Sequence, residues 1–471
     1  MTTVHPFGDK FIVYTKGGVD ELLSCCNSYQ IHNEKKTDLS EYESPIQKCN
    51  EELAENALRV LATGYKIIDK LDENEISNLE SNLTFIGLVA MMDPPRPEVK
   101  QAVEKCISAG IKTVMITGDH KVTATAIAKS LGILKDKSEA ITGSDLEKMT
   151  DEELIKNVRN YSVYARVSPE HKVRIVKAWQ ANGEIVAMTG DGVNDAPALK
   201  TADIGCAMGI VGTDVSKEAA DVILTDDNFA TIVSGVEEGR RIYDNILKAI
   251  QFLLSSNIGE IIVLSLAIML TPILASKFGI PADLINYLEP LLPVQILWIN
   301  LVTDSLPALA LAVDPAQKGI MKRKPLKAKG IFTKGMTFRV AYQGIMIGFI
   351  TLIAFVLGLS TEGVTPEEKI KIGQTMAFTV LALSEIVHIF NIRNNKESIF
   401  KGNIFNNSKL ILAAIASVSL MLVVLLVPAL REIFSITLLP KEKLLETIIL
   451  IFSPIVFVEI FKLLKINTID E

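Results

Sequence analysis

The chain has 471 residues, of which 49% are hydrophobic and 22% charged, and its formal net charge is −7. Charged residues are concentrated in the first half and long apolar runs in the second. This asymmetry excludes an ordinary soluble enzyme and predicts a soluble part followed by a membrane part. The negative charge and the lack of a basic stripe with interleaved aromatic residues argue against nucleic acid as a partner.

The first stretch, residues 1 to about 85, has the pattern of a mixed α/β domain. A strand is expected over Lys10–Thr15, and the glycines after it introduce an amphipathic helix. A longer helix is expected over Glu51–Tyr65, and it carries Arg59.

From Leu83 onward, strands and helices alternate. The expected strands cover Thr84–Met91, Ile111–Ile116, Tyr161–Arg166 and Glu184–Met188, and the expected helices cover Pro97–Ala109, Val122–Leu131 and Glu170–Gln180. This βαβ rhythm predicts a doubly wound, Rossmann-like sheet.

Polar loops follow two of these strands. One is Thr117-Gly118-Asp119, and the other is the run Thr189–Lys200, Thr-Gly-Asp-Gly-Val-Asn-Asp-Ala-Pro-Ala-Leu-Lys, which contains Asp191, Asn194 and Asp195. Because open α/β sheets bind their ligands at the carboxyl ends of the strands, both loops are expected to face one pocket. Their hard oxygen atoms suit Mg²⁺ and, through it, a phosphate. A shorter Asp/Gly/Asn match would more simply be a surface turn.

The run Thr189–Lys200 matches, without a departure, the hinge motif of the P-type cation-transporting ATPases, which this sequence resembles over essentially its whole length. Thr117–Asp119 is similar to the phosphate-contact motif of that family, and Met92–Arg96 to a third motif that contains Asp93. The resemblance implies a haloacid-dehalogenase-type α/β cytosolic domain followed by an all-α membrane domain of six transmembrane helices.

The resemblance also implies roles for individual residues in the transfer of the ATP γ-phosphoryl group to an aspartate. Asp191 would hold Mg²⁺, Thr117 and Lys172 would contact the phosphoryl oxygens, and Asn194 and Asp195 would brace the loop. Gly118 and Asp119 complete the first motif.

Further residues are assigned to the nucleotide by the same resemblance. Lys16 stands in the place of the lysine near ATP, although Gly18 departs from the Lys-Gly-Ala pattern there. Arg59 would face a phosphate, and Asp93 and Arg166 belong to the motifs that accompany the nucleotide. From residue type alone, Lys16 is an ordinary surface lysine.

No Asp-Lys-Thr-Gly-Thr run occurs in the sequence, so the aspartate that the family phosphorylates is not identified. We therefore expect the carboxyl-terminal half of a pump, in three parts. Residues 1–85 would complete a nucleotide-binding domain, 86–235 would form a phosphorylation domain without its nucleophile strand, and 236–471 the cation-transport domain. The isolated chain is expected to be inactive. A gene fragment, a mis-called start codon or a split gene would each produce such a chain, and in the last case a separately encoded amino-terminal half would be its partner.

The second half contains six apolar segments, each near the roughly 20 residues that cross about 30 Å of hydrocarbon. They lie around residues 247–270, 291–313, 337–359, 374–392, 409–430 and 445–464. The cation-rich loop 318–334 is expected in the cytosol, with the soluble part. The sequence therefore predicts a multi-pass protein in contact with lipid, in the plasma membrane of a prokaryote.

Ionisable and polar side chains occur inside these segments, where they usually mark an ion path. They are Asn257, Glu260, Asn300, Thr303, Asp304 and Glu385. Pro307 adds a ligand, because it cannot donate a hydrogen bond to the carbonyl of Thr303. Such a set of hard oxygens suits Ca²⁺.

The motifs around these residues resemble those of the sarcoplasmic-reticulum-type calcium pumps, which implies ATP-driven calcium transport with Mg²⁺, ATP and Ca²⁺. Three alternatives stay open. They are transport of sodium or another cation, a membrane-anchored phosphatase of the haloacid-dehalogenase type, and a non-catalytic ion-binding subunit that works with a separate amino-terminal half.

Overall fold

The computed structural model describes residues 1–31, 34–55, 58–71, 76, 78–91, 95–326, 330–395, 398–401 and 404–464. The chain forms two compact units, which are considered separately. The first contains Met1–Gly235 with Met321–Pro325, and the second contains Val236–Ile320 with Leu326–Glu471.

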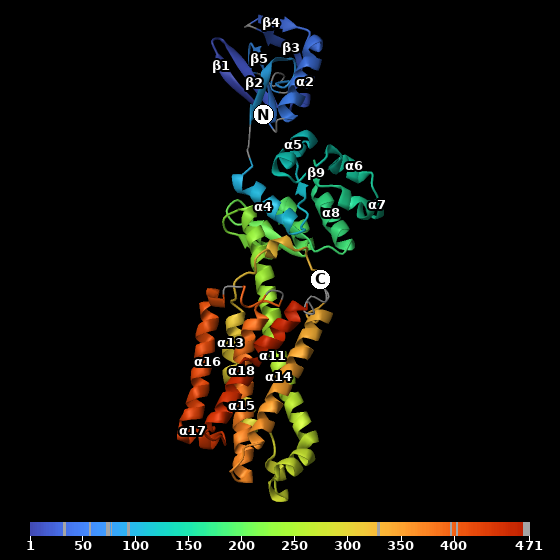
Figure 1. Cartoon of the computed structure of the whole chain (residues 1–471). Helices are drawn as coiled ribbons and strands as arrows, with labels where there is room; N and C mark the ends of the chain where they lie inside the picture. Colours follow the sequence, from blue (N-terminus) through green and yellow to red (C-terminus); the bar gives the residue numbers. More distant parts are fainter. Residues whose placement is uncertain are drawn as a thin grey trace. The chain divides into compact units, whose positions relative to one another are not determined.

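The first unit begins with a six-stranded sheet of order β1-β2-β5-β6-β3-β4 (Figure 1). Its strands are β1 (Thr2–Phe7), β2 (Lys10–Gly17), β3 (Cys26–Ile31), β4 (Glu34–Thr37), β5 (Arg59–Ile68) and β6 (Leu83–Met91). Helices α1 (Val19–Ser24) and α2 (Ser40–Glu55) accompany this sheet. Residues of α1 and of the sheet, such as Leu22, Ala62 and Leu83, share one buried apolar cluster.

The helix predicted over Glu51–Tyr65 is wrong. Helix α2 ends at Glu55, and Arg59–Ile68 is the strand β5, which is paired on both sides, with β2 and with β6. The segment alternates between a buried face that contains Ala62 and a more accessible face, and it is rich in β-branched and aromatic residues. Pairing on both edges therefore prevails over the local helical pattern.

Strand β6 also differs from its predicted place. It pairs antiparallel with β5 and parallel with β3, so it belongs to the first sheet and not to the parallel sheet that follows. The first sheet accordingly continues through Met91, past the expected boundary at residue 85.

The rest of the first unit has parallel strands and helices in alternation. The strands are β7 (Met115–Ile116), β8 (Ala140–Thr142), β9 (Val163–Ala165), β10 (Ala187–Gly190), β11 (Ile204–Met208) and β12 (Val222–Leu224). The helices are α4 (Pro97–Ser108), α5 (Lys121–Leu131), α6 (Gly143–Glu147), α7 (Asp151–Asn157), α8 (Pro169–Ala181), α9 (Ala196–Thr201) and α10 (Asp214–Ala219). These elements confirm the α/β class of the soluble domain.

One feature of the predicted sheet is different. The strands form two three-stranded parallel sheets, β7-β9-β8 and β10-β11-β12, so that β7 and β10 each lie at an edge. Helix α8 joins them, because its Ile175 packs in a cluster with Tyr164 of β9 and its Val176 in a cluster with Met188 of β10. Ile116 of β7 contacts both clusters.

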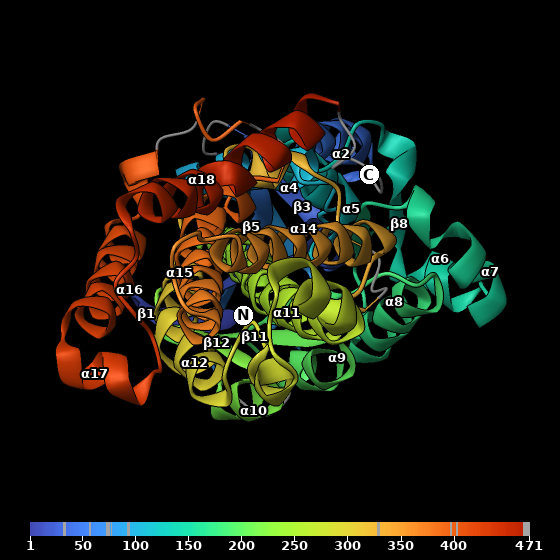
Figure 2. The ribbon, with the colours of Figure 1, turned by 60° about the horizontal axis from the view of Figure 1, so that its bottom comes forward.

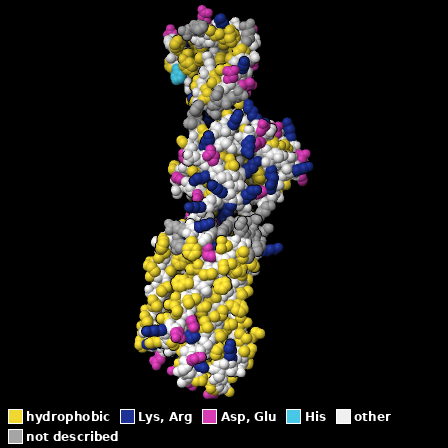
Figure 3. Space-filling view, viewed as in Figure 1, with side chains coloured by type: hydrophobic (Ala, Val, Ile, Leu, Met, Phe, Trp, Pro, Cys, Tyr) yellow, Lys and Arg dark blue, Asp and Glu magenta, His cyan; other side chains and the backbone are white. Residues whose placement is uncertain are grey.

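The second unit consists of helices. They are α11 (Phe229–Phe278), which belongs to this unit from Val236 onward, α12 (Pro293–Trp298), α13 (Ser305–Leu311), α14 (Lys334–Leu359), α15 (Pro366–Ile392), α16 (Ser408–Leu426), α17 (Pro428–Ile433) and α18 (Lys441–Leu463). In the described residues, six helical segments are long and apolar enough to cross a membrane, which confirms the predicted number. Hydrophobic side chains cover most of the visible face of these helices (Figure 3).

Helix α15 is the central helix of this unit. It packs against α14, α16 and α18 (Figure 2), and 83% of its most apolar window is buried inside the protein. The contact with α14 is close, because a Cβ atom on Gly358 would lie 2.3 Å from the Cα of Gly373. Polar side chains in the buried part of α15, such as Thr375, Ser384 and Glu385, therefore face protein and not lipid.

The segment predicted as one span over 291–313 is a broken helix. Helix α12 ends at Trp298, a π-helical turn η5 (Ile299–Thr303) follows, and α13 begins at Ser305. Pro307 contributes to the break, since it has no N–H group to continue the helical ladder. π-Helical turns inside helices are frequent at functional sites.

Candidate functional site

The loop after β10 is organised around Asp195. This carboxylate forms an ion pair with Lys172 of α8, and its second oxygen accepts hydrogen bonds from the backbone N–H groups of Asp191 (3.3 Å) and Gly192 (3.1 Å). Gly190 is required at this point, because a Cβ atom there would lie 2.4 Å from the Cβ of Asp195. The loop is therefore held in one conformation by an almost buried side chain.

The backbone of Asp191 is fixed from the other side by two residues that the sequence analysis did not select. Its carbonyl oxygen accepts hydrogen bonds from the N–H of Thr213 (2.8 Å) and the hydroxyl of Ser216 (3.0 Å). Ser216 is fully buried, and Thr213 is the N-cap residue of α10. The signal in the sequence is a helix start at Thr213, and only the fold shows that Thr213 and Ser216 also reach the Asp191 carbonyl.

The side chain of Asp191, by contrast, remains available. It is exposed, and none of the hydrogen bonds in the described part of the chain uses its carboxylate oxygens. Asn194 is also exposed. A carboxylate that is held by its backbone and free at its oxygens fits a Mg²⁺ ligand.

The loop after β7 is closed by its own hydrogen bonds. The Thr117 hydroxyl donates to the Asp119 carboxylate (3.0 Å) and accepts from the Asp119 N–H (3.1 Å). The Arg166 N–H donates to the Asp119 carbonyl (3.2 Å), with Arg166 in the left-handed region at φ 50°. Gly118, Asp119 and Arg166 are exposed. None of these bonds reaches Asp191–Asp195. In the described residues, the two loops are connected through the apolar clusters that contain α8 and not through a direct hydrogen bond.

The residues predicted for the nucleotide lie on the first sheet. Lys16 is aligned with Thr63 of β5, and Arg59 lies four residues before Thr63 on the same strand. Because side chains alternate along a strand, Lys16 and Arg59 share one face, about 13 Å apart along the strand direction. Both side chains are exposed. Asp93 lies outside the described residues.

In the second unit, three helices bring polar side chains together. The hydroxyl of Ser256 on α11 donates to the carboxylate of Asp304 (2.9 Å) and is in hydrogen-bonding contact with the carboxylate of Glu385 on α15. The side-chain amide of Asn300 donates to both oxygens of Glu260 (3.0 and 3.1 Å). Five residues from three separate segments thus form two adjoining contacts.

The two contacts are stacked along the helices. Ser256 and Glu260 are one turn apart on α11, and Asn300 and Asp304 are four residues apart on the broken helix, which runs in the opposite direction. We call Ser256, Glu260, Asn300, Asp304 and Glu385 the membrane polar cluster.

Two predicted members are placed differently. Asn257 is exposed, and its side chain takes part in no hydrogen bond of the described structure. Thr303 is fully buried, but its hydroxyl donates to the carbonyl of Ile299 (2.9 Å). Its own carbonyl has no N–H donor, because residue 307 is a proline, and it accepts a hydrogen bond from the hydroxyl of Ser417 on α16 (3.3 Å). Ser256 was missed, although its spacing of four residues from Glu260 places it on the same face.

Two oxygens of the membrane polar cluster have no hydrogen-bond partner although they are buried, namely Oδ1 of Asp304 and Oε2 of Glu385. Among the described residues, no three His, Cys, Asp or Glu side chains already form a group that could hold a metal ion. The unpartnered oxygens nevertheless fit a cation, because buried carboxylates without a partner are costly and a cation supplies that partner.

Three family models match the chain in succession. "P-type ATPase, cytoplasmic domain N" matches residues 1–98, "haloacid dehalogenase-like hydrolase" matches 70–200, and "Cation transporting ATPase, C-terminus" matches 288–464.

Curated relatives agree with these models. The chain is 46% identical to "Calcium-transporting ATPase 1" of Bacillus cereus over 99% of its own length and 52% of the relative. It is 45% identical to the "Calcium-transporting ATPase" of Bacillus subtilis, over 90% and 46% of the two chains. For "Calcium-transporting ATPase type 2C member 1" of Homo sapiens the identity is 36%, over 96% and 46%.

The fold, the loops and these matches define a multi-pass membrane protein with a haloacid-dehalogenase-like domain. The chain belongs to the family of the P-type cation-transporting ATPases. It spans about half of the length of the curated relatives that it matches.

Proposed function

We propose that this chain serves ATP-driven calcium transport as part of a P-type ATPase. The observation that carries the proposal is the membrane polar cluster, in which three carboxylates lie inside apolar helices with two of their oxygens unpartnered. The printed names of the relatives support calcium as the cargo.

In this proposal the soluble residues position the reacting groups. Asp191 would hold Mg²⁺, which when bound neutralises charge on the transferred phosphoryl group. Lys172 is held near the loop by Asp195, and it would supply a positive charge to the phosphoryl oxygens, as would the hydroxyl of Thr117. Lys16 and Arg59 would contact ATP from one face of the first sheet.

The nucleophilic aspartate would come from a strand outside residues 1–471. Among the described residues, β7 and β10 are each paired on one edge only, and both pack against α8, so a further parallel strand between them would join the two three-stranded sheets. The strand would be supplied by a preceding segment or by a separately encoded amino-terminal half. The bacterial relatives support the plasma membrane of a prokaryote as the location.

The cargo is tested by calcium binding to the purified chain in detergent. We expect radioactive calcium to bind and an excess of sodium to leave it bound, and Asp304→Asn to remove most of the binding. Glu446→Gln is a matched control, because Glu446 pairs with Lys443 (3.0 Å) on α18 and does not touch the membrane polar cluster. Displacement of calcium by sodium at similar concentrations would instead identify a sodium site.

A further inference from the structure

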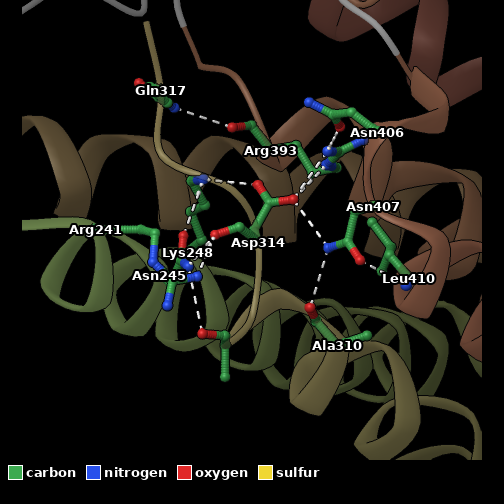
Figure 4. A network of polar contacts seen from close by, with 11 residues as sticks. Arg241, Asn245, Lys248, Ala310, Asp314, Gln317, Arg393, Asn406, Asn407 and Leu410 are labelled. Carbon is green, nitrogen blue, oxygen red and sulfur yellow. Dashed lines mark hydrogen bonds and ion pairs between the residues drawn. The ribbon is translucent and has the colours of Figure 1, made fainter. Parts of the chain in front are cut away.

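A second buried polar network surrounds Asp314, which lies just beyond the end of α13 (Figure 4). One carboxylate oxygen is 2.9 Å from Nζ of Lys248. The other is 2.9 Å from Nη2 of Arg393 and 3.0 Å from the side-chain amide of Asn407. Asp314 is only 3% exposed, so this carboxylate is bound between two cations inside the protein.

The backbone of Asp314 is fixed as well. Its carbonyl accepts hydrogen bonds from the amide of Asn245 (2.7 Å) and from Nη1 of Arg241 (3.1 Å), both on α11 (Figure 4). Asn407 donates in addition to the carbonyl of Ala310 (3.2 Å). The residue therefore holds the end of α13 through both its side chain and its main chain.

The network connects the same helices as the membrane polar cluster. On α11, Lys248 precedes Ser256 by eight residues, and on the α15 side Arg393 follows Glu385 by eight residues. Eight residues are about two helical turns, or about 12 Å. Helix α16 takes part in both places as well, since it begins after Asn407 and carries Ser417, which binds the Thr303 carbonyl.

We propose that Asp314 is a positioning residue for the membrane polar cluster. The π-helical turn and Pro307 interrupt the helix that carries Asn300 and Asp304, so its register is not fixed by a continuous backbone ladder. Asp314 fixes the far end of that segment against α11, α15 and α16, and this places Asp304 opposite Ser256 and Glu385. The inference rests on the proposed function, because it assigns the cluster to cation binding.

The electrostatics of the network favour a single arrangement. Burial alone would raise the pKa of Asp314, but the charge of Lys248 and hydrogen bonds from Lys248, Asn407 and Arg393 lower it below its ordinary value. The carboxylate therefore stays charged. Any shift of α13 that separated it from its partners would leave a buried charge without compensation, which is strongly unfavourable.

The first test is calcium affinity. Asp314→Asn keeps the shape of the side chain and removes its charge. We expect the calcium dissociation constant to rise about tenfold while the maximal binding stays the same. A tenfold change is at the lower end of the effect that residues contacting the metal ligands have on metal affinity. Asp314→Glu should recover part of the affinity. The matched control is Glu459→Gln, because Glu459 pairs with the buried Lys462 (3.0 Å) on α18, away from the cluster.

The second test does not depend on calcium. In Glu260→Cys/Asn300→Cys, whose native side chains are in contact, oxidation should form a disulfide rapidly. Adding Asp314→Asn should slow this cross-link several-fold, whereas adding Glu459→Gln should not. The native cysteines all precede residue 236. Proteolytic cleavage between the two parts of the chain therefore separates the fragment with the native cysteines from the fragment with the engineered disulfide.

The outcomes separate the two proposals. If the chain binds no calcium but Asp314→Asn slows the cross-link, the positioning role stands and the calcium function fails. If Asp314→Asn changes neither affinity nor cross-linking, the positioning role is wrong. Should Asp314→Asn not fold, Asn245→Ala takes its place, because it removes only the hydrogen bonds of Asn245. It is expected to lower calcium affinity and to slow the cross-link, as Asp314→Asn would.

Discussion

Lys172 in the first turn of α8 forms an ion pair with Asp195, the residue that also binds the backbone N–H groups of Asp191 and Gly192. The conformation of the loop and the position of the lysine thus depend on one carboxylate. Its side chain is only 10% exposed, so little water is available to replace either partner.

We therefore predict that Asp195→Asn loosens this loop. The amide keeps one oxygen but loses the charge that holds Lys172, and removal of a partner from a mostly buried hydrogen bond costs about 1–3 kcal/mol. Faster hydrogen exchange at the amides of Asp191 and Gly192 is the expected result. Lys172→Met is the control, because the Asp195 acceptor remains for both amides. Equal exchange in the wild type and Asp195→Asn would contradict the prediction.

The chain alone is expected to form no acid-stable phosphoenzyme from ATP or inorganic phosphate. The two carboxylates of the loop after β10 are not available as nucleophiles, because Asp195 forms an ion pair with Lys172 and Asp191 is proposed to hold Mg²⁺. Incubation with radioactive ATP followed by acid quenching measures this directly. Detection of an Asp-linked phosphate on this chain would show that a nucleophile is present within it.

Asp304 and Glu385 are expected to differ in their importance for calcium. Asp304 is next to the Thr303 carbonyl that Pro307 leaves without an N–H donor, so we predict that Asp304→Asn removes most of the calcium binding. Glu385→Gln should weaken the affinity and leave measurable binding. Equilibrium binding of radioactive calcium to each variant distinguishes the two. Normal calcium dependence in both variants, with a response to sodium, would support the sodium alternative.

We also predict, from the ion pairs of Asp314, that the stability of the folded protein falls at acid pH. The pKa of Asp314 is lowered in the folded protein, so its contribution to stability is fully present above its ordinary pKa of 3.8 and is lost as the pH falls through the lower folded value. The groups that face it are Lys248, Arg393, Asn407, Asn245 and Arg241. Thermal unfolding below about pH 4 should show a steeper loss for the wild type than for Asp314→Asn. Parallel pH profiles for the two proteins would contradict this assignment.

Much of the organisation could be predicted from the sequence, because it depends on local composition and spacing. An apolar segment of about 20 residues is long enough to cross a bilayer wherever it occurs, so the six helices were recognisable without tertiary information. The run Thr189–Lys200 likewise carries its own turn residues and carboxylates. The α/β class followed from the alternation of strands and helices.

Only the tertiary structure decided which residues meet. It made Arg59–Ile68 a strand, since that segment is paired on both edges, and it divided the expected parallel sheet in two. It placed Ser256 in the membrane polar cluster and left Asn257 exposed, although the two are neighbours in the sequence, because adjacent residues on a helix point about 100° apart. The partners of Asp314 come from α11, α15 and the start of α16, and no local pattern relates residues so distant in the chain.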